Sequence, residues 1–261
     1  MSTMRKKTVL PWRFALLFLL VTAIIVSAIP VAAAEASGAS SEPVLIIDPG
    51  HGGLDGGAVA SDGTKESDVN LAISLKLREL CLLFGIACAM TRDADTLPYP
   101  PELFGIREKK IWDQHRRAEQ INAFDDAVLI SIHQNNYPDA RPGGTQVLYA
   151  AGEPSARFGE LTHELLRCCL CPENRRVPAP ARDSIYLMQK VRCPAILVEC
   201  GFLSNPAELS LLKSPEYQTG IAAILLAGFR QFTQSTNENP SPEGETQHER
   251  KDDLLLHGMR E

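Results

Sequence analysis

The sequence lacks a surplus of positive charge. Four of its 26 basic residues (Arg5, Lys6, Lys7 and Arg13) lie at the start of the chain, and no acidic residue precedes Glu35. The rest of the chain therefore carries 22 basic and 32 acidic residues, which gives a net charge of −10. An acidic protein is poorly suited to binding an anionic polymer through bulk electrostatics, so we expect no nucleic-acid partner.

The seven cysteines lack the pattern of a zinc finger. Cys168, Cys169 and Cys171 lie together in the stretch CCLC, but a second pair of Cys or His residues at zinc-finger spacing is missing. We therefore expect no structural metal there. Cys81 and Cys88 lie in apolar runs, which indicates that they fill the core. An odd number leaves at least one thiol unpaired in a monomer, and the sequence leaves any pairing open.

The apolar run near the N-terminus is shorter than the roughly 20 residues that typically cross a membrane. It spans the 16 residues 14–29, follows the basic start, and precedes small residues that would suit cleavage after Ala34 or Ala36. This layout is typical of a secretory signal. We favour a cleaved signal over an uncleaved membrane anchor for residues 1–43. In either case the body of the protein is expected to work outside the cytoplasm.

The middle of the chain, residues 44–234, alternates strand and helix signals. Short apolar runs ended by Gly, Pro or a polar residue predict strands, and apolar residues spaced three or four apart predict helices. Such alternation predicts a single α/β domain with a mostly parallel, twisted sheet flanked by helices. The expected strands cover 44–50, 86–92, 127–133, 144–150 and 194–200, and the expected helices cover 66–85, 108–124, 155–170, 207–214 and 216–233.

The C-terminal residues 235–261 are polar, charged and contain proline. This composition predicts a disordered acidic tail. Between the fourth expected strand and the fifth lies one clear helix, and a short hairpin is expected to fill the remainder. No internal repeat is visible.

Polar residues stand where the expected strands end. His51, His133 and Glu199 each follow an apolar strand, and Glu66 begins the helix that the first loop enters. Ligands of open α/β sheets bind outside the carboxyl ends of the strands. We therefore expect these four side chains to meet on one edge of the sheet.

Two imidazoles and one carboxylate are a ligand set for a catalytic zinc ion with one position open to water. His51, Glu66 and His133 supply this set, and we expect one zinc per chain. Zinc makes water acidic near neutral pH. Glu199 is then placed to take up the proton and deliver it to a leaving amine, with a pKa raised by apolar neighbours. Asp48 is a candidate for orienting an imidazole through a hydrogen bond to the ring nitrogen that does not bind the metal.

Taken singly, these residues have simpler explanations. His133 alone would be interpreted as a loop histidine, Glu66 as a helix-start acid favoured by the helix dipole, and Asp48 as a turn residue before proline. Glu199 is harder to explain this way, because an unpaired buried carboxylate is costly. The zinc hypothesis therefore depends on the joint arrangement.

Six sequence blocks occur in the order of a known family. They are IIDPGHGG, KESDVNLAISLKLREL, MTRDADT, RRAEQIN, LISIHQN and PAILVECGFLSNPAELSLL. Over residues 44–233 the chain thus resembles the zinc-dependent N-acetylmuramoyl-L-alanine amidases with the type 3 catalytic domain. The resemblance implies hydrolysis of the amide between N-acetylmuramic acid and L-Ala in peptidoglycan. It implies zinc on His51, Glu66 and His133, and a catalytic Glu199.

The stretch 183–205 is most similar to the germination-specific amidases of spore-formers. Those enzymes remove the stem peptide from cortex peptidoglycan before muramic δ-lactam forms. Some family members carry a long inhibitory helix between the second His and the catalytic Glu. Only the 65 residues from 134 to 198 separate the two here, so we expect an uncovered active site.

Other functions stay open at this point. One is a vegetative cell-wall amidase that acts in wall turnover or cell separation. Another is a different zinc hydrolase, such as a peptidase or a sugar deacetylase, because its ligands would be the same. A third is a non-catalytic peptidoglycan-binding relative, although such a protein would be expected to lose a ligand or Glu199. The sequence identifies neither the stem-peptide chemistry nor any activating protein.

Overall fold

The computed structural model describes residues 42–238. The apolar run at 14–29, nearly all of the predicted signal segment, and residues 239–261 of the predicted tail lie outside this range. Within it, no helix is both long and apolar enough to cross a membrane.

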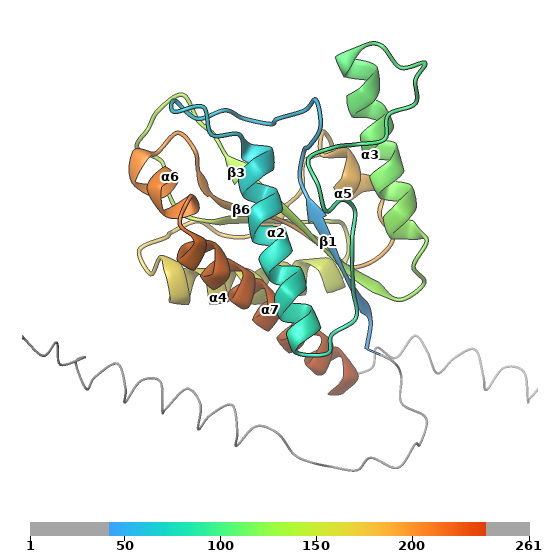
Figure 1. The fold of residues 1–261 in the computed structure, drawn as a ribbon. Coiled ribbons are helices and arrows are strands. Elements are labelled where there is room, and N and C mark those ends of the chain that lie inside the picture. Colours follow the sequence, from blue (N-terminus) through green and yellow to red (C-terminus); the bar gives the residue numbers. More distant parts are fainter. Residues whose placement is uncertain (1–41, 239–261) are drawn as a thin grey trace, which may run out of the picture. The chain divides into compact units, whose positions relative to one another are not determined.

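A six-stranded sheet forms the centre of the domain (Figure 1). Its strands lie in the order β2-β1-β3-β6-β4-β5, and only the β4–β6 pair is antiparallel. The prediction of a single α/β domain with a mostly parallel sheet is therefore confirmed. The strands are β1 (Val44–Pro49), β2 (Cys88–Met90), β3 (Ala127–Asn135), β4 (Gln146–Tyr149), β5 (Ala179–Pro180) and β6 (Ala195–Phe202).

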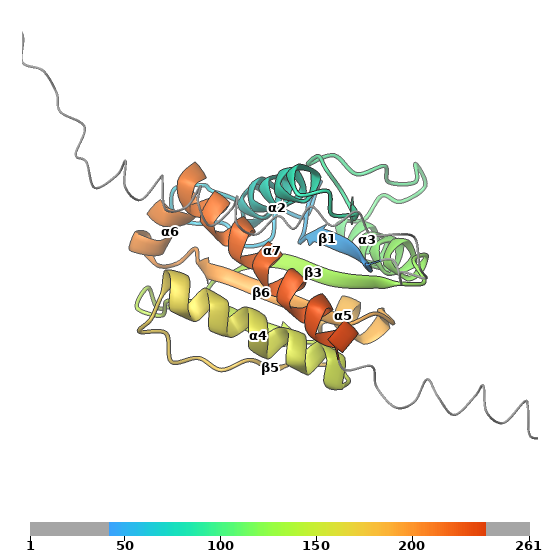
Figure 2. The ribbon, with the colours of Figure 1, turned by 90° about the horizontal axis from the view of Figure 1, so that it is seen from below.

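Helices cover both faces of the sheet (Figures 1 and 2). One face is packed by α2 (Glu66–Leu83), α4 (Glu153–Leu170), α6 (Pro206–Leu212) and α7 (Pro215–Glu238), and the other by α3 (Ile106–Asn122) and α5 (Tyr186–Lys190). Successive residues of a strand point to opposite faces. Leu45 and Ile47 accordingly enter the core beneath α2 and α7, while Ile46 enters the core beneath α3. A strand covered on both sides is largely apolar, as β1 is from Val44 to Ile47, before the buried acid Asp48.

Three elements differ from expectation. The segment after α4 does not form the expected hairpin. It contains instead the short strand β5, which pairs in parallel with β4, and the five-residue helix α5. Both are too short to leave a periodic pattern in the sequence. At the C-terminus α7 continues through Glu238, so residues 235–238 of the predicted disordered tail are helical.

Candidate active site

His51 projects from a sharp turn at the end of β1. The strand ends at Pro49, and His51 has φ of 61°, a left-handed conformation that is uncommon for residues with a side chain. Arg117 of α3 holds this turn, because its guanidinium donates 2.7 Å to the carbonyl of Pro49 and also bonds to the carbonyl of His51. The turn thereby directs the imidazole of His51 back toward the start of α2.

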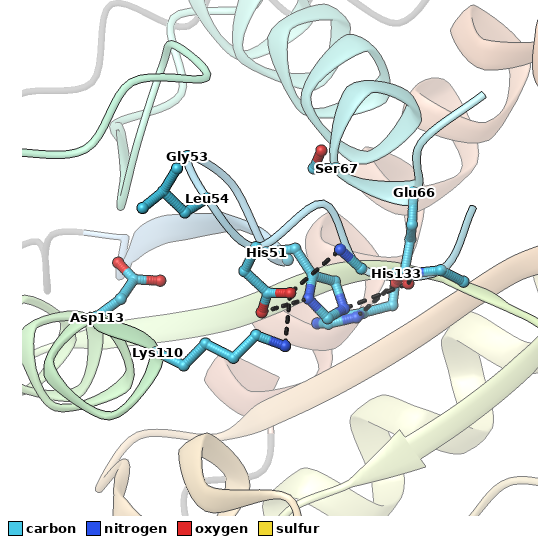
Figure 3. Close-up of polar contacts among 12 residues, drawn as sticks. His51, Gly53, Leu54, Glu66, Ser67, Lys110, Asp113 and His133 are labelled. Atoms are coloured by element: carbon cyan, nitrogen blue, oxygen red, sulfur yellow. Dashed lines mark hydrogen bonds and ion pairs between the residues drawn. The ribbon is translucent and has the colours of Figure 1, made fainter. Parts of the chain in front are cut away.

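Glu66, the first residue of α2, lies between the two imidazoles (Figure 3). Its Oε2 is 3.3 Å from Nε2 of His51, and its Oε1 is 3.0 Å from Nδ1 of His133. The main-chain N–H groups of Ala58 and Gln134 also donate to this carboxylate, at 2.9 and 3.1 Å. One ligand atom from each of the three predicted residues lies within 4.8 Å of the others. The tertiary structure therefore brings the three predicted ligands together.

Two glycines make this close packing sterically feasible. A Cβ on Gly50 would lie 2.3 Å from Cε1 and Nε2 of the His133 ring. A Cβ on Gly57 would lie 2.6 Å from Oε2 of Glu66, and Gly57 also has a positive φ of 67°. The glycines around His51 thus let the backbone approach the ligand side chains.

Asp55, rather than Asp48, supports an imidazole. Nδ1 of His51 is 3.0 Å from Oδ2 of Asp55, and Nζ of Lys110 on α3 lies 2.8 Å from the other oxygen. Figure 3 shows Lys110 extending toward this group. A carboxylate bonded to the far nitrogen of a metal-binding imidazole fixes its tautomer and orientation. Asp55 was not among the residues predicted from the sequence, although an acid four residues after His51 in the same turn was a usable signal.

The role of Asp48 in orienting an imidazole stays a prediction, because its side-chain hydrogen bonds go to other groups. Asp48 is 1% exposed and accepts hydrogen bonds from Thr91 (2.6 Å), Ser131 (2.7 Å) and Arg117 (3.0 Å). Burial raises the pKa of Asp48, but the Arg117 charge and the two hydroxyl groups outweigh it and lower the pKa overall. Asp48 therefore acts on the site indirectly, by anchoring the arginine that grips the His51 turn.

Glu199 lies in β6, directly opposite His133 of β3. Its Oε2 is buried and has no hydrogen-bond partner among the described residues. Burial, countered by the positive field of His133 and reinforced by Glu66, raises the pKa of Glu199 to about 7. A carboxyl group with such a pKa can both accept and donate a proton near neutral pH. The pKa shift expected from the apolar strand is thus present in the structure.

Two neighbouring cavities meet at Glu199. A cavity of about 270 Å³ is lined by His51, His133 and Glu199, and one of about 850 Å³ extends from Glu199 along β4 and β5. The imidazoles keep side-chain exposures of 25% for His51 and 19% for His133. Helix α4 lies on the opposite face of the sheet, against α7. The site is therefore open to a bulky substrate.

The donor set and its electrostatics fit a divalent cation. Two nitrogen donors and one carboxylate oxygen are the ligands of catalytic zinc sites. Burial opposes a positive charge on His51, but bonding to Asp55 and Glu66 raises its pKa to about 9. Burial likewise raises the pKa of Glu66, yet the two imidazoles lower it overall. The site thus stabilises positive charge between its carboxylates.

The fold and this site define an α/β domain with a His–Glu–His cluster that could hold a metal ion at the carboxyl edge of its sheet. The chain belongs to the Amidase_3 family of N-acetylmuramoyl-L-alanine amidases, which it matches over residues 45–231. It is accordingly an N-acetylmuramoyl-L-alanine amidase, and the family resemblance read from its sequence is confirmed.

Individual relatives agree with this assignment. The chain is 37% identical to the germination-specific N-acetylmuramoyl-L-alanine amidase of Bacillus subtilis, over 74% of this chain and 81% of that protein. It is 30% identical to the amidase AmiC of Neisseria meningitidis, but the match spans only 52% of that longer protein. Among solved structures, the CwlD amidase of Clostridioides difficile, in complex with the GerS lipoprotein, is 35% identical with a TM-score of 0.71. That match covers 74% of this chain and 99% of CwlD.

Proposed function

We propose that the protein is a zinc-dependent amidase that removes stem peptides from the peptidoglycan of the spore cortex. The observation that carries the catalytic part is the meeting of His51, Glu66 and His133 within 4.8 Å, beside the unpartnered carboxyl oxygen of Glu199. One zinc per chain would be held by those three residues. Zinc at such a site supplies Lewis acidity, which makes water acidic near neutral pH.

Glu199 would move the proton during hydrolysis. Its unpartnered Oε2 is the atom free to accept a proton from the attacking water. The protonated carboxyl group would then donate to the nitrogen of L-Ala, because an amine leaves an amide poorly without a proton. Lys110 and Asp55 would keep the imidazole of His51 in one orientation throughout.

The larger cavity provides room for the polymer. It lies between Glu199 and the segment from Arg176 to Ile185, and Tyr137, Arg176 and Arg182 are among the side chains that line it. Its volume of about 850 Å³ is at the upper end of what small-molecule sites enclose, and it is open at the surface. We propose that the muramic acid residue and the start of its stem peptide lie there.

The cortex role is favoured over a vegetative one by the match to a germination-specific amidase that spans 81% of that protein. Digestion of purified cortex and of vegetative wall, followed by mass spectrometry of the products, tests both parts. Free stem peptide with L-Ala at its amino terminus is expected from cortex. Release from vegetative wall alone would favour wall turnover or cell separation. Products cut elsewhere would favour a peptidase or deacetylase, and no products would favour a non-catalytic peptidoglycan-binding protein.

The proposed organisation places residues 1–43 as a signal or anchor, 44–234 as the catalytic domain and 235–261 as a tail. The enzyme would then act extracytoplasmically, secreted or held at the envelope through residues 14–29. The sequence identifies no activating protein. The CwlD structure contains a lipoprotein, and a comparable partner for this chain is testable by co-purification from sporulating cells.

A further inference from the structure

Arg92 is a buried cation whose position needs an explanation. It lies just beyond β2, near the edge of the sheet, and is only 6% exposed. All of its hydrogen bonds within residues 42–238 end on main-chain carbonyl oxygens rather than on a carboxylate. Burial and the neighbouring charge of Arg117 lower the pKa of Arg92 to about 10. Burying a charge without an ionic partner is unfavourable, so this arginine is not explained by stability alone.

Three of the four carbonyls that Arg92 holds belong to the two segments that carry the proposed metal ligands, and the fourth is that of Ala94. Its Nε donates to Pro49 and its Nη2 to Gly50, each at 3.0 Å, and these residues directly precede His51. The same Nη2 donates at 3.0 Å to the carbonyl of Ser67, the residue that follows Glu66. A single nitrogen atom thus joins the turn that carries His51 to the helix that carries Glu66.

The turn that carries His51 packs directly against the guanidinium of Arg92. A Cβ on Gly52 would lie 2.7 Å from Nε of Arg92, and Gly52 has a positive φ of 126°. His51 next to it is also left-handed, at φ of 61°. A positive φ is uncommon for a residue with a side chain, so contacts from outside the turn help to hold this conformation. The planar guanidinium can hold several carbonyls at once in a fixed geometry, which a lysine ammonium cannot.

We propose that Arg92 is a positioning residue, which sets the placement of His51 relative to Glu66 before the metal binds. This inference rests on the proposed zinc centre. Asn70 supports the same link, because its Nδ2 lies 3.1 Å from the carbonyl of Gly50 and 3.4 Å from Oε1 of Glu66. A centre whose ligands are already in place binds its metal more tightly, because less order is created on binding.

Arg92 is a better probe than Arg117, which grips the same turn. Arg117 is paired with Asp48 at 3.0 Å and with Asp113 at 2.6 Å. Its removal would leave two buried carboxylates without their cation and would threaten the fold. Replacing Arg92 leaves carbonyl groups that retain other partners or can be hydrated. The matched control is Arg78, whose one ion pair within residues 42–238 is a 3.7 Å contact with the exposed Asp93.

The experiment compares R92M, R92K and R78K in the full chain. Zinc affinity is measured by competition with a chromophoric chelator, and amide hydrogen exchange of the metal-free proteins is followed by mass spectrometry. R92M is expected to weaken zinc binding by about 10- to 100-fold, with R92K intermediate and R78K equal to wild type. In metal-free R92M, exchange is expected to rise in residues 50–57 and to stay unchanged in α7.

Each outcome decides the proposal. R92M and R92K proteins that fold and bind zinc as wild type does would overturn it. Faster exchange spread evenly over the domain would also overturn it, because that result marks a general loss of stability. If R92M does not fold, R92K carries the test alone. A wild-type protein that binds no zinc would instead refute the proposed function, and the exchange of residues 50–57 would still report on Arg92.

Discussion

Glu199 lies directly opposite His133 where β6 pairs in parallel with β3. Paired residues of adjacent strands project from the same side of a sheet. The proposed proton carrier and a proposed metal ligand are therefore held beside each other by the hydrogen bonds of the sheet. A site built on central strands keeps this spacing far better than one built on flexible loops.

The first prediction concerns this carboxyl group. Glu199→Gln should retain the fold and full zinc but lower turnover by about 10² to 10⁴, because Gln has nearly the same shape and cannot carry the proton. Zinc content and turnover should be measured on the same purified variant. Loss of zinc would show that Glu199 is a ligand. Near-normal turnover would show that another group moves the proton.

The second prediction concerns the three ligands. Wild-type protein should contain one zinc per chain, and His51→Ala, Glu66→Ala and His133→Ala should each lose both zinc and activity. Glu79→Ala is the control, because Glu79 lies exposed on the same helix as Glu66. Elemental analysis and peptide release from peptidoglycan are the readouts. Equal activity in protein shown to be metal-free would refute the zinc centre.

The third prediction concerns Gly50. The substitution Gly50→Ala places a methyl group about where the His133 ring now lies, 2.3 Å from its nearest atoms. The ring must move, so zinc affinity should fall by about 10- to 100-fold. Gly220→Ala in α7 is the matched control, because its new Cβ meets no atom within 4 Å. That control should stabilise the protein by about 0.5–1 kcal/mol, since alanine favours a helix over glycine. Gly50→Ala with wild-type zinc affinity would contradict the close packing.

The fourth prediction concerns Asp48 and pH. Asp48→Asn should destabilise the protein by about 3 kcal/mol at neutral pH, because it leaves Arg117 short of a buried counter-charge. The pKa of Asp48 is lowered in the folded state. Its stabilising contribution is thus complete above the unfolded pKa, about 3.9, and is lost as the pH falls through the folded value.

Urea unfolding at several pH values tests this. The difference in the free energy of unfolding between wild type and Asp48→Asn should be constant above about pH 5 and should become smaller toward lower pH. Asp62→Asn is the control, because Asp62 is exposed and accepts hydrogen bonds at the surface from Lys213 and from the Thr64 N–H, and exposed ion pairs contribute little. A difference in unfolding free energy that does not change with pH would mean that the charge of Asp48 is not what stabilises the fold.

The fifth prediction concerns residues 1–43. Fused to a reporter that is active only outside the cytoplasm, this segment should export it, because a basic start precedes an apolar run and an alanine-rich stretch. A fusion in which the basic residues Arg5, Lys6 and Lys7 are replaced by Glu should be exported poorly. A wild-type fusion that stays in the cytoplasm would contradict the prediction.

The sequence by itself determined the alternation of strands and helices and the residues at the edge of the sheet. Apolar runs such as β1 must be buried on both faces, and parallel strands with intervening helices place all their carboxyl ends together. The meeting of His51, Glu66 and His133 follows from that topology, so it could be predicted before their distances were known.

Only the tertiary structure decided which side chains support those ligands. Asp48 and Asp55 are both acids within four residues of His51, yet the left-handed turn at His51 directs Asp55 to the imidazole and leaves Asp48 facing Arg117. Arg92 reaches the same turn from the end of β2, about 40 positions along the chain. Such partners depend on how a turn bends and which helix packs over it, and these are set by long-range packing that no local pattern records.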